Sequence, residues 1–186
     1  MPKENTTVYI ILGLLNHEDL SGYDIKKRID NMISYFWEAG YGQIYPTLAR
    51  LETEGLVEKR ISKFSGGPEK NLYSITSEGK EELRRWMGIP EQKEYTKYEI
   101  LVKLFFGKLA SFEENTNRLQ AFKERQVKNM EMMEQYARNL QQVMDREEDH
   151  VFYYLTVLFG KYIYNAYIEW ADEARAILED KYGNKK

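Results

Sequence analysis

The two halves of the chain have amino-acid patterns that predict different architectures. Residues 1–88 contain short apolar segments separated by glycines and other turn-forming residues, whereas residues 89–186 are nearly free of glycine and proline. Gly88 and Pro90 lie at the joint, and both residue types end helices. A chain of 186 residues is long enough for two small domains. We therefore expect one domain in residues 1–88 and a second, built of long helices, in residues 89–186.

Charge and cysteine content exclude several classes of protein. The net charge is −3, and acidic and basic residues nearly balance in both halves, so any DNA affinity must come from a local basic patch. The absence of cysteine excludes disulfides and thiolate metal sites and fits a cytoplasmic protein. The apolar run at residues 8–15 is shorter than the roughly 20 residues that span a bilayer. We expect a buried first helix there and no membrane association.

Helical periodicity in the first half predicts three helices. The first covers about residues 7–15, and the second begins at Ser21, which has the spacing of a capping box with Asp24. The third carries Pro46. Since proline is tolerated in the first turn of a helix, this helix is expected to start near Gly42 and to run to about Glu54.

Two alternating segments, at residues 56–64 and 70–76, predict strands that flank a Gly-Gly-Pro loop in a β-hairpin. Thr76 is placed to cap a fourth helix over about residues 77–87, with Leu83, Trp86 and Met87 buried. The expected order is helix, helix, helix, strand, strand, helix.

The second half predicts long amphipathic helices. Residues 94–109 fit one such helix, and Ser111 with Glu114 forms a full capping box for the next. That helix has a narrow apolar stripe like a coiled-coil seam. The last helix starts near Asp149 and has a broader stripe.

The start of the third helix has the residue types of a DNA-reading surface. Ile44, Leu48 and Leu51 are expected to point inward. The solvent-facing side offers glutamine, which can bind adenine bidentately, and tyrosine, threonine and arginine, which suit phosphates or base edges. The alternative is a polar helix face without a partner. The predicted contacts on this helix are Tyr41, Gln43, Tyr45, Pro46, Thr47 and Arg50.

The predicted hairpin is basic. Lys59, Arg60, Lys63 and Lys70 surround its tip, against the single acid Glu69. A helix-turn-helix followed by a basic hairpin is the layout of a winged helix, whose third helix enters the major groove while the wing contacts the backbone or the minor groove. A solvated surface loop is the alternative. The predicted contacts of the wing are Lys63, Gly66, Gly67 and Lys70.

Several sequence blocks resemble the PadR family of winged-helix transcriptional regulators. These are ILGLL (residues 11–15), SGYDI (21–25), GQIYPTLARLETEGLV (42–57), GPEKNLYSITSEGKEELRRW (67–86) and LVKLFFGKL (101–109). The resemblance implies a mainly α fold: a winged helix-turn-helix domain of three helices, a two-stranded wing and a fourth helix, followed by a helical dimerisation domain.

The resemblance also implies a function. It implies a homodimeric regulator, usually a repressor, that binds a palindromic operator in double-stranded DNA. Some members are released by small molecules, phenolic acids in the founding case. Gln43, Tyr45 and Pro46 match recognition-helix positions, and residues 66–70 match the wing, where Glu69 departs from the usual basic pattern.

The broad apolar stripe of the last helix also favours a dimer, because one narrow seam cannot cover it. A two-fold dimer would place two recognition helices about 34–36 Å apart, one turn of DNA. An intramolecular three-helix bundle is the alternative. The predicted dimer residues are Leu155, Leu158, Phe159, Tyr162, Ile163, Tyr167 and Trp170.

Other functions have weaker support in the sequence. The two histidines, His17 and His150, lie at helix boundaries. The sequence has no nucleophile signature and no phosphate-binding loop, so we expect the protein to have no enzymatic activity, metal site or cofactor. A winged-helix protein adaptor that binds no operator is the alternative function. Aromatic residues between 152 and 170 also motivate a hypothesis that a pocket between the domains accepts a small aromatic effector.

Overall fold

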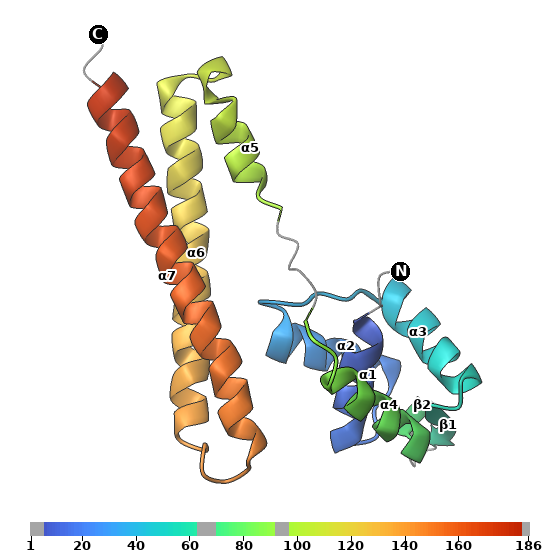
Figure 1. Cartoon of the computed structure of the whole chain (residues 1–186). Coiled ribbons are helices and arrows are strands. Elements are labelled where there is room, and N and C mark those ends of the chain that lie inside the picture. The colour runs from blue at the N-terminus through green and yellow to red at the C-terminus, as the bar shows by residue number, and fades with distance from the viewer. Residues whose placement is uncertain (1–5, 63–69, 92–96, 184–186) are drawn as a thin grey trace. The chain divides into compact units, whose positions relative to one another are not determined.

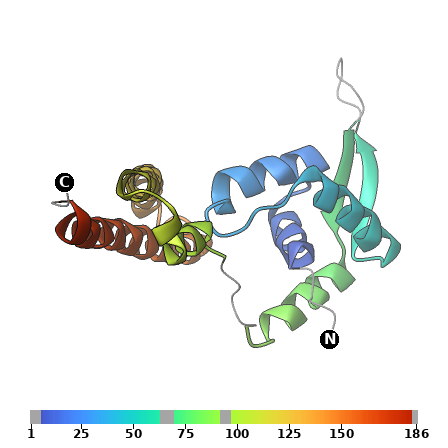
Figure 2. The same cartoon turned by 90° about the horizontal axis from the view of Figure 1, so that it is seen from above.

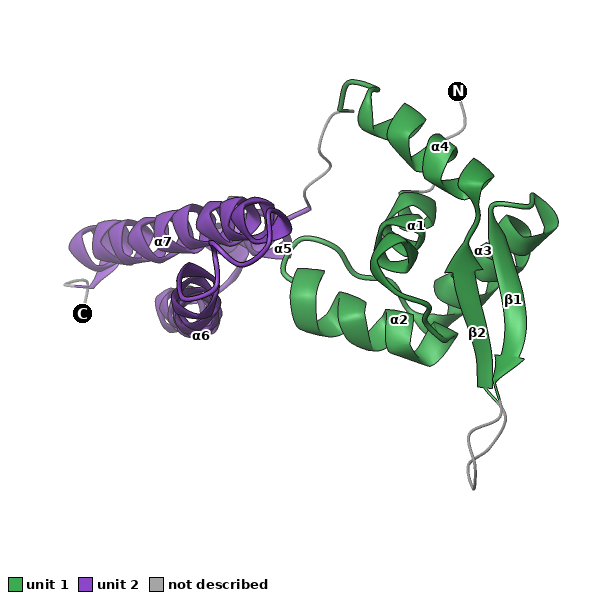
Figure 3. Cartoon of the chain, turned by 90° about the horizontal axis from the view of Figure 1, so that it is seen from below, with its two compact units in different colours: residues 1–93 green, residues 94–186 purple. Residues whose placement is uncertain are grey.

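The computed structural model describes residues 6–62, 70–91 and 97–183. The chain divides into two compact units, residues 1–93 and residues 94–186 (Figure 3). Each unit has a hydrophobic core of its own. The expected domain boundary after residue 88 stays a prediction.

Short helices and one β-hairpin make up the first unit, in the predicted order (Figure 1). Its elements are α1 (Thr7–His17), α2 (Gly22–Arg28), the π-helical turn η1 (Ile29–Ile33), α3 (Tyr41–Thr53), β1 (Val57–Ser62), β2 (Lys70–Ile75) and α4 (Ser77–Met87). The side chains with 0% exposed surface in its core are Ile11, Leu12, Ile25, Ile29, Ile44, Leu48 and Leu51. Each such burial stabilises the fold by about 1.5–3 kcal/mol.

Local hydrogen bonds fix where α2 begins and α3 ends. The predicted capping box is present: the Asp24 amide donates to Ser21 Oγ (3.2 Å), and the Ser21 amide donates to the Asp24 carboxylate (3.4 Å). After α3, Gly55 has a φ of +73°, which favours glycine. The Leu56 amide then donates to the Leu51 carbonyl (2.9 Å) in a Schellman motif.

β1 and β2 pair antiparallel along their whole lengths and lie beside α3 (Figure 2). Two backbone hydrogen bonds, of 3.1 and 2.9 Å, join Leu20 to Tyr73 in β2. The hairpin is therefore tied to the residue that precedes the α2 cap. Its far end extends past the core, and Ile61 there is 62% exposed.

α4 packs against α1 and is capped by Thr76, as predicted. Trp86 stacks on Tyr9 with ring centroids 4.4 Å apart and planes 8° apart. The Tyr9 hydroxyl also donates to Glu82 (3.2 Å). The prediction that Met87 is buried is wrong, since it is 70% exposed. It is the last residue of α4 and lies about 100° around the helix from Trp86.

The second unit is built of helices only in its described residues. Its elements are α5 (Glu99–Phe105), the 3₁₀ turn η2 (Gly107–Leu109), α6 (Phe112–Gln141) and α7 (Asp149–Tyr182). The single helix expected over residues 94–109 is wrong: α5 starts only at Glu99, and residues 92–96 lie outside the described residues. α5 ends at Phe105 because Gly107 interrupts it and the Asn115 side chain donates to the Gly107 carbonyl (2.8 Å).

α6 and α7 lie side by side and form most of this unit (Figure 1). α6 starts at the predicted Ser111 capping box. Its apolar stripe is buried, with Leu119 1%, Phe122 7% and Met133 0% exposed. The predicted fold class, a mainly α winged helix-turn-helix followed by a helical region, is confirmed.

Candidate nucleic-acid interface

α3 has one buried and one exposed side. Ile44, Leu48 and Leu51 are fully buried, as predicted, and anchor the helix in the core of the first unit. The predicted contacts that are exposed on α3 are Tyr41, Gln43, Tyr45, Pro46 and Arg50. The helix therefore presents aromatic and polar side chains on a rigid apolar base, an arrangement suited to reading another molecule.

The start of α3 offers hydrogen-bond donors to an anion. The first amides of a helix have no partner within it, and the helix dipole adds partial positive charge there. At this end the Gly40 amide donates to Gln43 Oε1 (3.3 Å). A bidentate contact of Gln43 with adenine would replace only this long, exposed hydrogen bond.

Tyr41 and Tyr45 form a stacked pair on the exposed side, with ring centroids 6.0 Å apart and planes 22° apart. They are 45% and 49% exposed. Each ring restricts the other, so less conformational entropy remains to be lost on contact with a ligand. The pair is the largest exposed aromatic feature of α3.

Pro46 lies in the second turn of α3, and the prediction of a first-turn position is wrong. α3 begins at Tyr41, so Pro46 is its sixth residue. Because proline lacks an N–H group, the Gly42 carbonyl loses its usual donor four residues later.

The prediction that Thr47 faces solvent is also wrong, since Thr47 is only 5% exposed. It lies three residues after Ile44 and four before Leu51, which places it on the buried stripe. Thr47 is therefore not available for a side-chain contact with DNA.

The described part of the hairpin carries exposed basic residues at Lys59, Arg60 and Lys70. Arg60 forms an ion pair with Asp19. An exposed pair of this kind contributes about 0–1 kcal/mol, so Arg60 can exchange Asp19 for a phosphate at small cost. The other predicted wing contacts, Lys63, Gly66 and Gly67, lie outside the described residues.

Gly22, the buried first residue of α2, lies against Tyr45 and was missed from the sequence. A Cβ atom added to it would lie 2.5 Å from Cε1 of Tyr45. Tyr73 of β2 interacts electrostatically with Tyr45. Burial raises the pKa of the Tyr73 phenol, and Glu52 and Tyr45 raise it further. A glycine directly after the Ser21 cap, where no turn requires one, was the available signal.

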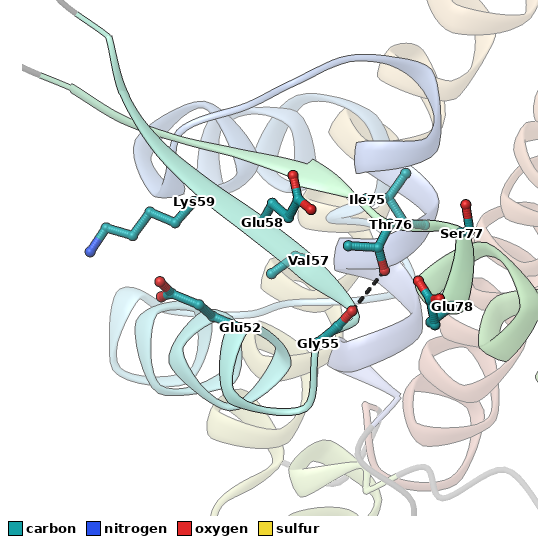
Figure 4. A pocket seen from close by; sticks show the side chains of 9 residues that line it. All are labelled: Glu52, Gly55, Val57, Glu58, Lys59, Ile75, Thr76, Ser77 and Glu78. Carbon is teal, nitrogen blue, oxygen red and sulfur yellow. Dashed lines mark hydrogen bonds between the residues drawn. The ribbon is translucent and has the colours of Figure 1, made fainter.

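An open depression of ≈ 700 Å³ lies where α3, the hairpin and the start of α4 meet (Figure 4). The Thr76 hydroxyl donates to the Gly55 carbonyl (2.8 Å) at its edge. Glu52, Glu58 and Glu78 line it, with Lys59 as its basic residue. Three carboxylates repel phosphate, so the depression does not extend the candidate DNA surface.

The predicted dimer residues on α7 separate into three groups. Tyr167 and Trp170 pack against Phe122 within the same unit, with ring centroids 5.9 and 5.5 Å from it. The members that are more than half exposed are Leu155 (54%), Phe159 (63%) and Tyr162 (71%). Leu158 and Ile163 are half-buried.

His150 has a structural contact: its Nδ1 lies 2.7 Å from the Val143 carbonyl oxygen. The described residues contain no group of three histidine, cysteine or acidic side chains that could hold a metal ion.

Among the helices of residues 6–62, 70–91 and 97–183, none is both long and apolar enough to cross a membrane.

Comparison with known proteins gives matches along most of the chain. Residues 11–85 match the Transcriptional regulator PadR-like family, and residues 96–179 match the family described as Virulence activator alpha C-term. The negative transcriptional regulator PadR of Bacillus subtilis is 29% identical over 181 residues, which cover 92% of this chain and 96% of that protein.

Solved structures show the same similarity. The PadR-like regulator BC1756 of Bacillus cereus superposes with a TM-score of 0.79 at 27% identity, over 96% of this chain and 98% of that one. Bacillus subtilis PadR in complex with operator DNA gives a TM-score of 0.76 at 27% identity, over 94% and 99%. The same protein in complex with p-coumaric acid gives 0.68 at 26%, over 94% and 99%.

Proposed function

Because the chain belongs to the PadR-like family of transcriptional regulators, we propose that it is a cytoplasmic repressor that binds a palindromic DNA operator as a homodimer. Members of this family are regulators and not enzymes. The question that remains for this chain is how its own residues contact DNA, its second copy and a ligand.

The observation that carries the proposal is the exposed side of α3. The stacked pair Tyr41 and Tyr45 lies there with Gln43 and Arg50, over a fully buried apolar base. In this proposal α3 enters the major groove, where glutamine and tyrosine meet base edges and arginine meets base edges or phosphate. The related PadR whose structure contains operator DNA supports this assignment.

The hairpin supplies the sequence-independent part of the affinity. In the proposal Lys59, Arg60 and Lys70, together with Lys63, Gly66 and Gly67 beyond the described strands, contact the DNA backbone. Lysine and arginine neutralise phosphates and release counterions, so their contribution weakens as salt rises.

A homodimer accounts for the exposed apolar side of α7. Phe152, Leu155, Phe159 and Tyr162 are spaced 3, 4 and 3 residues apart, so they share one side of the helix, and all are more than half exposed. A second copy related by a two-fold axis would cover this side and pair two recognition helices for two half-sites.

A small aromatic molecule is the proposed effector, supported by the p-coumaric acid complex of the related PadR. An effector that binds a DNA-incompetent state more tightly weakens operator binding by that difference in affinity, typically about 1–3 kcal/mol. Thermal-shift screening with aromatic acids tests this part. If no compound raises Tm or dissociates the DNA complex, the effector is not of this class.

Binding of the purified protein to the DNA upstream of its own gene tests the main proposal. The measurement uses rising salt and unrelated DNA as competitor. We expect a complex of two chains per site that resists competitor, with log K falling linearly in log salt. Binding that neither prefers this DNA over competitor nor depends on salt would contradict the proposal and favour a protein adaptor.

A further inference from the structure

Gly22 provides the space in which the ring of Tyr45 lies. A Cβ atom added to Gly22 would lie 2.5, 2.9 and 3.2 Å from Cε1, Cζ and Cδ1 of Tyr45. The first two distances are too short for real contacts. The backbone at position 22 does not require glycine, because Gly22 does not have a positive φ. Among the described residues, Gly55 is the glycine that does. The absence of a side chain at position 22 therefore leaves room for the Tyr45 ring.

The backbone around Gly22 is fixed on both sides. Leu20 is joined to Tyr73 of β2 by two backbone hydrogen bonds, and Ser21 is locked in the capping box with Asp24. A methyl group at position 22 cannot push this backbone aside at low cost. The Tyr45 ring, which is 49% exposed and can rotate into solvent, must move instead.

Tyr41 also lies against the Tyr45 ring, with ring centroids 6.0 Å and planes 22° apart. A ring in contact with both the Gly22 backbone and Tyr41 is held in one orientation before any ligand arrives. Such pre-organisation strengthens recognition because less side-chain entropy is lost on binding. A tyrosine carries no charge, so its orientation affects contacts with base edges and not the number of neutralised phosphates.

We propose that Gly22 is a positioning residue that sets sequence preference by holding Tyr45, and through it Tyr41, in the orientation that meets the base edges. This inference rests on the proposed DNA-binding function. It assigns to the first residue of α2 a role in how α3 reads DNA, without a DNA contact of its own.

The test is Gly22→Ala in the full-length chain, with operator DNA and unrelated DNA measured in parallel over a range of salt. We expect operator affinity to fall about tenfold, the loss of roughly one base-edge contact. Affinity for unrelated DNA and the salt slope stay unchanged, because no cation is removed. Tm stays equal or rises, because alanine at an unstrained helical position reduces the entropy of the unfolded chain.

A double-mutant cycle separates positioning of the ring from general damage. In a Tyr45→Ala background, Gly22→Ala should have no further effect on operator affinity, since the ring it displaces is absent. Gly13→Ala in α1 is the matched control: it is also a helical glycine, but its added Cβ meets nothing within 4 Å. It should leave operator affinity unchanged.

Four results would each overturn the inference. Equal operator affinity of Gly22→Ala and the wild type would show that the ring position does not matter, while leaving the DNA-binding proposal intact. A lower Tm, or an equal loss for unrelated DNA, would show that the backbone gives way and not the ring. A wild type with no operator preference would remove the proposed function and this inference together.

Discussion

The two units differ in how the apolar side chains of their main helices are exposed. In the first unit Ile44, Leu48 and Leu51 have no exposed surface, whereas on α7 of the second unit Leu155 and Phe159 are 54% and 63% exposed. Apolar side chains are exposed in α5 and η2 as well. Those that are more than half exposed there are Val102, Phe105, Phe106 and Leu109. The first unit also has exposed apolar side chains, such as Ile61 and Met87, but those of the second unit follow one side of α7 and the region of α5. We propose that the first unit binds DNA and that the second joins two chains.

A matched pair of leucine substitutions tests this difference most strongly. Leu51→Ala should lower the free energy of unfolding by about 2–5 kcal/mol, because it leaves a cavity in a closed core. Leu155→Ala should lower it little in dilute solution and more as protein concentration rises, because in the proposed dimer Leu155 contacts the second copy. Urea unfolding at several concentrations measures both. Equal, concentration-independent losses would show that the two sites do not differ in this way.

A charge on the exposed side of α7 should separate the dimer. Phe159→Glu is expected to raise the dimer dissociation constant by about 30-fold or more, the effect of losing an interface hot spot. Analytical ultracentrifugation measures it. Asn165→Glu, at an exposed position about 120° around α7 from Phe159, is the control and should leave the dimer intact. If Phe159→Glu still dimerises like the wild type, α7 does not form the interface.

A smaller effect is expected inside the second unit, where the Tyr98 and Tyr167 hydroxyls hydrogen-bond to each other. Burial raises the pKa of Tyr167, and the Tyr98 bond raises it further. A phenol with a raised pKa in the folded state contributes stability that is complete below the ordinary tyrosine pKa of about 10 and is lost as pH rises beyond it.

Tyr167→Phe should therefore lower the free energy of unfolding by about 1 kcal/mol at neutral pH and reduce its decline above pH about 10. Chemical denaturation between pH 7 and 11 measures this. Tyr136→Phe, on α6 and outside the proposed dimer side, is the control and should change neither value. A decline of unchanged size in the Tyr167 variant would show that another group titrates.

Most of the elements could be predicted because local signals determine them. The Ser21, Thr76 and Ser111 caps all occur where their spacing predicted, and the hydrophobic periodicity of α3 and α6 correctly gave the buried sides. Such signals need only a few neighbouring residues, so they can be read without the fold.

One error came from judging a residue by its type instead of by helix phase, and the others came from contacts between separate segments. Thr47 was expected to face solvent because it is polar. Its position in the helix places it on the buried stripe, and it is buried. α5 is short because Asn115, eight residues after Gly107, binds its carbonyl. Gly22 contacts Tyr45 only after α2 and α3 pack together. No pattern within one segment contains these contacts.

In our proposal the first unit binds DNA through α3 while the second unit joins the two chains. The most direct test of this proposal is to measure operator affinity and the dimer dissociation constant of Tyr45→Ala beside those of the wild type. We predict that operator affinity falls about 10–100-fold, while the dimer constant stays the same. Unchanged operator affinity, or a loss explained by a weaker dimer, would contradict the claim.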